Sequence, residues 1–146
     1  MMSRQHAITI ALTALALGPA LAHALELPNK IGLSREAYLL VQQIYHGWAL
    51  LGIVVILQIL LCGVLAWRLR GRIGGSLVLI AFLCAAGTQV VFWGWTYPAN
   101  AATAQWTMLP EGWEALRAQW EYSHAAGAGL NLAALGFLLA AAVIRH

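Results

Sequence analysis

Four long apolar runs dominate the pattern of hydrophobic and polar positions along the chain. Each has the roughly 20 residues that an α-helix needs to cross the hydrocarbon core of a bilayer. Trp48 and Trp67 bound the second run, where indole rings anchor helices at the membrane–water interface. The pattern predicts a single all-α domain over residues 1–146, a bundle of four transmembrane helices. The predicted spans are residues 7–27, 48–67, 73–97 and 125–144.

Short polar segments separate these runs and predict where the helices begin and end. Pro28 is expected to stop the first helix, and Ser34 to cap a second helix that continues to about residue 68. Pro98 is expected to end the third helix, because the residue before a proline disfavours helical geometry. Pro110 suits the first position of a helix. Residues 98–124 are therefore predicted to form an outer loop and an amphipathic lead-in that extends the fourth helix.

Composition supports a membrane protein and excludes other classes. The chain is 62% hydrophobic and 9% charged, whereas a soluble domain carries about 25% charged residues. No basic face suited to nucleic acid is present. The lipid bilayer is thus the predicted environment, and no nucleic-acid partner is expected.

The distribution of charge predicts the orientation of the bundle. One predicted side carries five basic residues and no acidic residue, and the other carries three basic residues and all five glutamates. Because cytoplasmic loops are rich in Lys and Arg, we expect an N-in, C-in arrangement in the plasma (inner) membrane, with the glutamates on the extracytoplasmic side. The first group is Arg4, Arg68, Arg70, Arg72 and Arg145; the second is Lys30, Arg35 and Arg117.

The first apolar run also has the features of a signal peptide. A basic start precedes an apolar core over residues 7–17, and Ala20 and Ala22 form a small-x-small cleavage motif after Pro19. Cleavage after Ala22 would make His23 the first residue of the mature chain. The charge distribution does not decide between cleavage and a retained helix, so both remain open at this point.

Polar side chains gather at the predicted outer ends of the helices. His23 and Glu26 are three residues apart, as are Glu121 and His124, so each pair lies on one helical face. His46 lies about one turn before the second membrane run. Imidazole and carboxylate groups together suit transition metals. The sequence therefore predicts a metal site, with iron or copper as candidate cofactors, formed by these five residues.

The same pocket is predicted to perform redox chemistry on a small lipid-soluble molecule. His46, His124 and Glu121 are the candidate catalytic groups, because imidazole titrates near neutral pH and a partly desolvated glutamate can act as a general base. Asn131 follows His124 by seven residues, so it lies on the same face deeper in the membrane. The candidate substrate-binding residues are Asn100, Trp93, Trp106, Trp120 and Asn131.

Several motifs resemble a family of small four-helix membrane proteins grouped with anthrone oxygenases. They are His-Ala-Leu-Glu-Leu-Pro-x-Lys from His23, Tyr-His-Gly-Trp around His46, and Trp-x-Tyr-Pro-Ala-Asn, which contains Pro98 and Asn100. The resemblance extends from about residue 7 to residue 144. Anthrone oxygenases insert oxygen into activated polycyclic aromatics, so the resemblance implies an oxygenase-like activity, an aromatic substrate and a retained first helix.

Two other functions fit the same residues. The first is a haem- or quinone-binding protein without turnover of its own, in which His46 and His124 would ligate haem from facing helices. The second is an accessory subunit of a membrane complex, or a homo-oligomer, with the tryptophan-rich loop as its docking surface. Absence of a Soret band would exclude haem, and a stable co-purifying protein would favour the accessory subunit.

Overall fold

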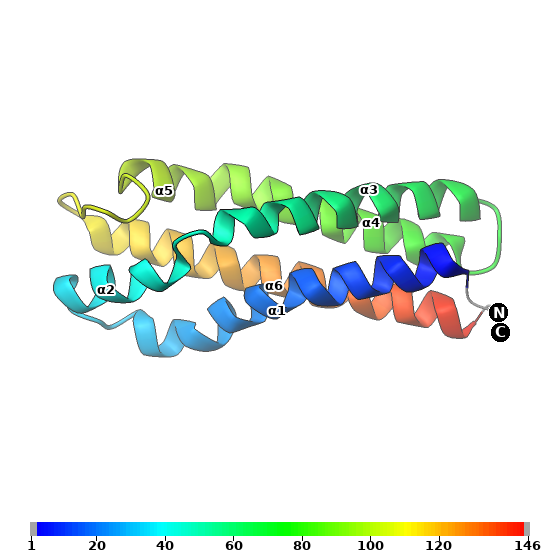
Figure 1. Ribbon diagram of the computed structural model, residues 1–146, viewed down its shortest axis with the longest axis horizontal. Helices are drawn as coiled ribbons and strands as arrows, with labels where there is room; N and C mark the ends of the chain where they lie inside the picture. The colour runs from blue at the N-terminus through cyan, green and yellow to red at the C-terminus, as the bar shows by residue number, and fades with distance from the viewer. Residues whose placement is uncertain (1–2, 145–146) are drawn as a thin grey trace.

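The structure is a bundle of helices that run along one axis, with both ends of the chain at the same end of the molecule (Figure 1). It is a computed structural model and describes residues 3–144. Within that range there is no strand, and four helical segments are long and apolar enough to cross a membrane, as predicted. These segments are Arg4–Lys30, Trp48–Leu69, Gly75–Ala102 and Trp113–Val143.

The first helix, α1 (Arg4–Lys30), is longer than predicted. Ser3 caps its start by accepting a hydrogen bond from the backbone N–H of His6. Pro19 and Pro28 both lie inside the helix, and Pro28 does not stop it. Membrane helices tolerate proline because neighbouring groups satisfy the freed carbonyls. The extra turn brings Lys30 onto the same helical face as Glu26, four residues earlier, with which it forms an ion pair.

The predicted second helix is interrupted. α2 (Arg35–Gln42) is followed by two 3₁₀ turns, Gln43–Tyr45 and Trp48–Leu50, before α3 (Leu51–Leu69) begins. Gly47 separates these turns with φ of 86°. A right-handed helix cannot continue through that left-handed conformation, which glycine adopts without steric cost. The interruption turns the chain and places Tyr45 and Trp48 against the side of α1.

The third span continues past Pro98, contrary to the prediction. α4 (Gly75–Val91) passes through a π-helical turn (Phe92–Thr96) into α5 (Tyr97–Ala102). Pro98 lies in the first turn of α5, where a missing N–H is tolerated.

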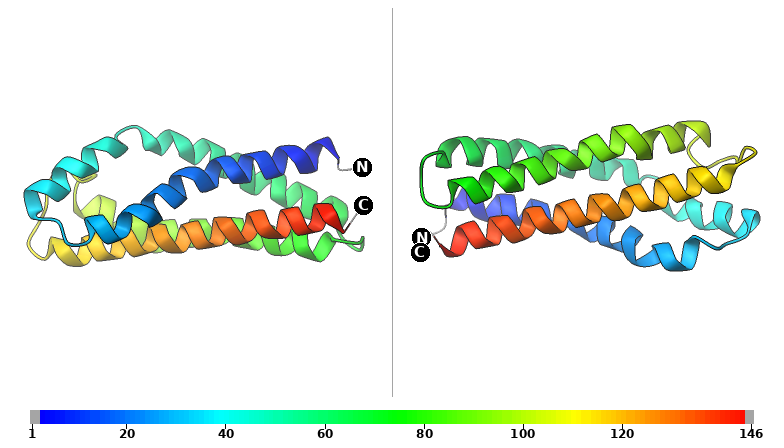
Figure 2. Two further views of the ribbon diagram at one scale, coloured as in Figure 1. Left: turned by 90° about the horizontal axis from the view of Figure 1, so that it is seen from below. Right: turned by 180° about the vertical axis from the view of Figure 1, so that it is seen from behind.

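The last helix, α6 (Trp113–Val143), begins three residues later than expected. Gly112 precedes it with φ of 72°, and Pro110 lies in the loop. α6 is continuous through residues 113–143 and packs against both α1 and α4 (Figure 2). This packing brings the C-terminal end of α1 and the N-terminal end of α6 together beside α2. This end of the bundle is called the outer end below, and the opposite end is called the inner end.

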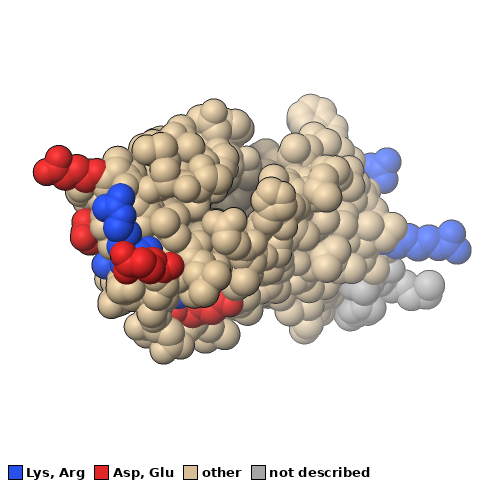
Figure 3. Space-filling model, turned by 60° about the vertical axis from the view of Figure 1, so that its left-hand side comes forward, with Lys and Arg blue, Asp and Glu red and all other residues tan. Residues whose placement is uncertain are grey.

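Two different cores hold the bundle together. The inner half of the bundle is packed with small and aliphatic side chains such as Ala81, Ala134 and Leu138. The outer half contains a mainly aromatic core, in which Ala99 and Leu109 pack among the rings of Tyr38, Trp106, Trp113 and Trp120. On the face that Figure 3 shows, the acidic side chains lie at the outer end, and basic side chains lie at both ends.

Candidate functional site

A buried lysine lies at the centre of the polar residues of the outer end. The Lys30 ammonium is 3.3 Å from Glu26 Oε2 and 3.2 Å from Glu121 Oε2, and it donates a 2.8 Å hydrogen bond to Tyr45 Oη. Lys30 is 3% exposed and Glu121 is fully buried. A buried charge is costly unless it is paired. Here one cation lies between two carboxylates, and the three groups that accept from or pair with the ammonium are Glu26, Glu121 and Tyr45.

Two tyrosines complete this network by donating hydrogen bonds to the same carboxylates. Tyr38 Oη donates to Glu121 Oε1 at 2.9 Å, and Tyr45 Oη donates to Glu26 Oε2. Burial, followed by the nearby Glu121 carboxylate, raises the pKa of Tyr38 far above its usual value. Burial and the hydrogen bond to Glu26 likewise raise the pKa of Tyr45. Both side chains are therefore held as phenols.

Two histidine rings stack beside this network. The ring centroids of His23 and His124 are 4.2 Å apart, with an angle of 29° between the ring planes. Trp120 packs edge-on against both rings, with centroid distances of 5.0 Å to His23 and 4.2 Å to His124. Tyr45 and Trp48 cover His23 at 4.4 and 5.4 Å. His23 is 6% exposed, and its Nδ1 atom is buried without a hydrogen-bond partner among the described residues.

Asn100 positions the indole ring that supports the histidines. Its Oδ1 accepts hydrogen bonds from the indole N–H groups of Trp106 and Trp120, both at 2.8 Å. The loop that follows Asn100 closes through three consecutive left-handed residues, Ala104, Gln105 and Trp106, with φ of 48°, 59° and 60°. This conformation is costly for residues with a side chain. The buried Trp106 ring and its bond to Asn100 offset that cost.

Three of the predicted site residues lie apart from this cluster. His46 is exposed beside Gly47, and no contact joins its ring to His23 or His124. Trp93 is 60% exposed and packs against Phe92 and Tyr97. Asn131 is buried deeper in the bundle, where its Oδ1 accepts a 3.0 Å hydrogen bond from Gln58. The structure thus brings together His23, Glu26, Asn100, Trp106, Trp120, Glu121 and His124, but not His46, Trp93 or Asn131.

The geometry does not support the predicted metal centre. Among residues 3–144, no group of three or more His, Cys, Asp and Glu side chains is arranged to hold a metal ion. The cation between Glu26 and Glu121 is the Lys30 ammonium. The haem alternative also meets a geometric obstacle. His46 is exposed, and the stacked rings of His23 and His124 leave no space between them for a porphyrin.

Sequence reasoning missed Lys30, Tyr38 and Tyr45. The spacing of Glu26 and Lys30 is that of a helical ion pair, but it is informative only if the helix continues through Pro28. Tyr38 lies on the buried side of the short helix α2. The amphipathic pattern of that helix could have identified Tyr38 as a buried residue. Tyr45 had no such signal, because its position depends on the turn at Gly47.

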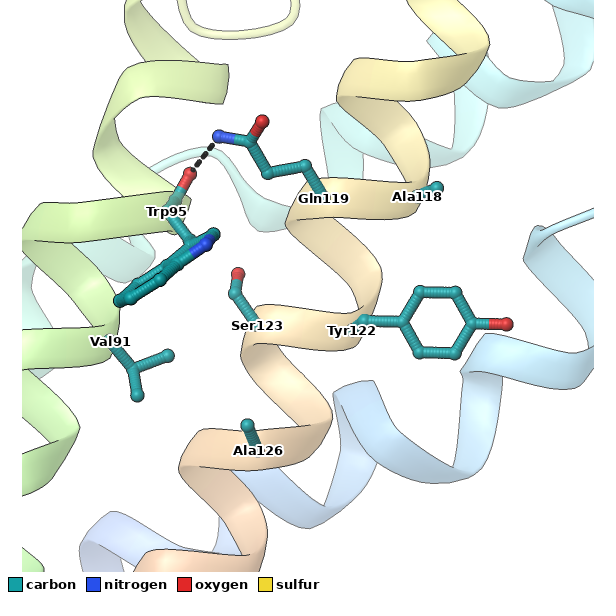
Figure 4. Close-up of a pocket in the computed structure, with 7 residues that line it drawn as sticks. All are labelled: Val91, Trp95, Ala118, Gln119, Tyr122, Ser123 and Ala126. Atoms are coloured by element: carbon teal, nitrogen blue, oxygen red, sulfur yellow. Dashed lines mark hydrogen bonds between the residues drawn. The ribbon is translucent and has the colours of Figure 1, made fainter.

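A separate groove lies on another side of α6. Its volume is about 440 Å³, and Gln119 closes one end with a 2.8 Å hydrogen bond to the backbone oxygen of Trp95 (Figure 4). The wall is almost entirely apolar. It contains none of the residues of the Lys30 network and neither of the stacked histidines. The lining residues are Val91, Trp95, Ala118, Gln119, Tyr122, Ser123 and Ala126.

The fold and site define a four-helix bundle of the membrane type with a buried polar and aromatic cluster at one end. Comparison with protein-family models, with curated proteins and with solved structures gave no match.

Proposed function

We propose that the protein binds a lipid-soluble, weakly acidic aromatic molecule at the His23–His124 pair and removes a proton from it in an oxygenase-like reaction. The family resemblance of the sequence motifs suggests anthrone-type ketones, whose methylene carbon lies between aromatic rings, as the substrate class.

The observation that carries this proposal is the unpartnered Nδ1 of His23. Buried polar atoms in proteins nearly always have a hydrogen-bond partner, so a buried acceptor or donor without one marks a position for a ligand. A neutral imidazole nitrogen in a wall of aromatic rings suits a planar ligand with an acidic C–H or O–H group. His23 would act as the general base, and His124 and Trp120 would hold its ring in place.

The Lys30 network would hold the ring that supports the two imidazoles. Its ammonium lies 5.2 Å from the centre of the Trp120 ring, which in turn contacts both imidazoles. Glu26, Glu121 and Tyr45 surround its three protons. With two carboxylates against one ammonium the network has no net positive charge, so its part in the proposal is to hold Trp120 and the imidazoles in place and not to balance the anion.

The overall reaction would consume dioxygen. The methylene group loses one proton to His23 Nδ1 and becomes an enolate, which then reacts with O₂. The methylene carbon becomes a carbonyl carbon in the product, and the second oxygen atom is released as water. One CH₂ and one O₂ thus give one C=O and one H₂O. The proton on His23 returns to the product water.

Access to the imidazole pair would require the covering segment to move. Tyr45 and Trp48 cover His23 from the two 3₁₀ turns, which meet at Gly47. Ile44 and Leu50, in the same segment, are 59% and 72% exposed. Apolar side chains exposed at the end of a membrane helix face lipid, so the ligand would enter from the outer leaflet of the bilayer.

The test is oxygen uptake by detergent-purified protein supplied with anthrone. His23→Gln should abolish the anthrone-dependent uptake, because an amide is not a base. His46→Gln is the matched control and should leave uptake unchanged, since His46 is exposed and outside the cluster. Equal loss in both variants, or full activity of His23→Gln, would overturn the proposal.

We further propose that the site faces the extracytoplasmic side of the plasma membrane. The basic turn that contains Arg68, Arg70 and Arg72 would lie in the cytoplasm, as the positive-inside rule favours. Labelling of single cysteines with an impermeant maleimide in intact cells tests this orientation. A cysteine at position 46 should react from outside and a cysteine at position 71 should not, and the reverse result would refute it.

A further inference from the structure

The outer core contains an unbroken chain of oxidisable aromatic rings. From Trp113 the chain passes to Tyr38 with a centroid distance of 5.7 Å, to Trp106 at 5.3 Å and to Trp120 at 5.7 Å. From Trp120 it continues to Tyr45 at 5.7 Å, and then to Trp48 at 5.1 Å. Aromatic packing alone explains why neighbouring rings are in contact. It does not explain why both tyrosines of this aromatic chain, Tyr38 and Tyr45, are hydrogen-bonded to carboxylates.

Each of these tyrosines has a proton acceptor in place. Tyr38 donates to Glu121, and Tyr45 donates to Glu26. Oxidation of a phenol by one electron makes its proton strongly acidic, so a carboxylate at hydrogen-bond distance can take that proton as the electron leaves. The raised pKa of both phenols means that each keeps its proton until it is oxidised. The other two tyrosines of the protein, Tyr97 and Tyr122, lie outside the aromatic chain and are exposed. No hydrogen bond joins either of them to a carboxylate in the described residues.

Positive charges lie beside both the tryptophans and the tyrosines of the aromatic chain. The Lys30 ammonium is 5.2 Å from the Trp120 ring and 4.8 Å from the Tyr45 ring. The Arg117 guanidinium is 4.5 Å from the Trp113 ring and 5.5 Å from the Tyr38 ring. A cation near a ring opposes removal of an electron from it, because the product is a radical cation. A tyrosine that loses its proton becomes a neutral radical, and a nearby cation opposes it less. Lys30 also donates a hydrogen bond to Tyr45 Oη, which would stabilise the radical oxygen.

We propose that this chain carries one-electron oxidising equivalents through the outer core, and that they come to rest on Tyr38 and Tyr45 as neutral radicals. This activity does not depend on the imidazole pair acting on a substrate. The oxidant we name is an organic peroxyl radical in the outer leaflet of the bilayer.

Oxidation of Tyr38 by this radical moves one electron and one proton. The peroxyl radical takes one electron through the aromatic rings and one proton from water, and becomes a hydroperoxide. Tyr38 loses one electron to the rings and its phenolic proton to Glu121 Oε1. The products are one hydroperoxide, one hydroxide ion from the water, one neutral tyrosyl radical and one protonated Glu121. Glu26 plays the corresponding role for Tyr45.

The experiment is photochemical oxidation of the purified protein in nanodiscs, with a ruthenium(III) polypyridyl complex as the one-electron oxidant and electron paramagnetic resonance as the readout. The chain has four tyrosines, so a signal spread evenly would fall by half in any variant that lacks two of them. The Tyr38→Phe/Tyr45→Phe variant should instead lose nearly all of the tyrosyl signal. The Tyr97→Phe/Tyr122→Phe variant, the matched control, should lose almost none. Equal losses in the two variants would overturn the proposal.

A second measurement uses the unaltered protein, in case the buried substitutions prevent folding. A radical on the fully buried Tyr38 should persist when ascorbate is added to the aqueous phase, whereas a radical on an exposed tyrosine should be reduced at once. Rapid loss of the whole signal, or a tryptophanyl radical as the final species, would contradict the proposal. Glu121→Gln should reduce the persistent signal, because an amide cannot accept the phenolic proton.

Discussion

Replacement of Lys30 by methionine tests the network that holds the outer end of the bundle together. Methionine has a similar length but no charge, so Lys30→Met leaves the Glu26 and Glu121 carboxylates without a cation. Glu121 is fully buried and would keep only the hydrogen bond from Tyr38. Removing one partner of a buried ion pair costs about 3–5 kcal/mol, because the other charge stays buried and unpaired. We expect the free energy of unfolding to fall by that amount.

Loss of Glu26 and loss of Glu121 should reduce the free energy of unfolding by different amounts, because the two side chains differ in exposure. The Glu26 side chain is 38% exposed, so water screens its attraction to Lys30. Exposed pairs contribute at most about 1 kcal/mol, and Glu26→Gln should therefore be mild. The double variant Lys30→Met/Glu121→Gln should recover most of the stability that Lys30→Met loses, since it removes the unpaired buried charge.

The assay is reversible unfolding in mixed micelles with increasing dodecyl sulfate, followed by tryptophan fluorescence, because Lys30 lies over the Trp120 ring. Arg72→Met, at an exposed position of the other end, controls for the loss of a basic residue. A cost below about 1 kcal/mol for Lys30→Met, the size of a surface pair, would refute the reasoning. So would a double variant whose cost equals the sum of the two single costs.

Three further predictions follow from the outer end. Asn100→Leu leaves two indole N–H groups without their acceptor and should reduce the free energy of unfolding by about 1–3 kcal/mol per buried group, measured by the same titration. The pKa values of Tyr38 and Tyr45 are raised, so two of the four tyrosines should ionise only well above pH 10, the ordinary value for a phenol, in an ultraviolet absorbance titration. Their contribution to stability is complete below about pH 10 and is lost as the pH rises through the folded-state values; ionisation of all four near pH 10 would contradict this. Gly47→Ala should cost about 1 kcal/mol because its φ is 86°, whereas Gly52→Ala, inside α3 with open space around it, should gain about 0.5–1 kcal/mol.

The sequence predicts the four spans well because their signal is the length of an uninterrupted apolar run. Helix ends were harder, since proline has two opposite effects. Pro28 and Pro98 would stop helices in water, but within a membrane bundle the helices pass through them. Because the first helix continues through Pro28, Lys30 lies on α1 and not in the loop in which it was expected.

The candidate site was predictable in part. The spacing of His23 with Glu26, and of Glu121 with His124, correctly indicated which faces of α1 and α6 meet. His46 was placed with them on the assumption of one continuous helix through residues 35–68. The left-handed conformation of Gly47 breaks that register and turns the His46 ring outward. A single backbone angle, which the pattern of apolar residues does not encode, thus changed the composition of the site.

The most direct test of the central claim is nitrogen NMR of the five histidines, labelled with ¹⁵N, as anthrone is added. The His23→Gln variant assigns the His23 signals. The account predicts that Nδ1 of His23 has no hydrogen bond in the free protein, that its resonance shifts as the ligand binds, and that the His46 resonances stay in place. Ligand-dependent shifts at His46 with none at His23 would contradict it.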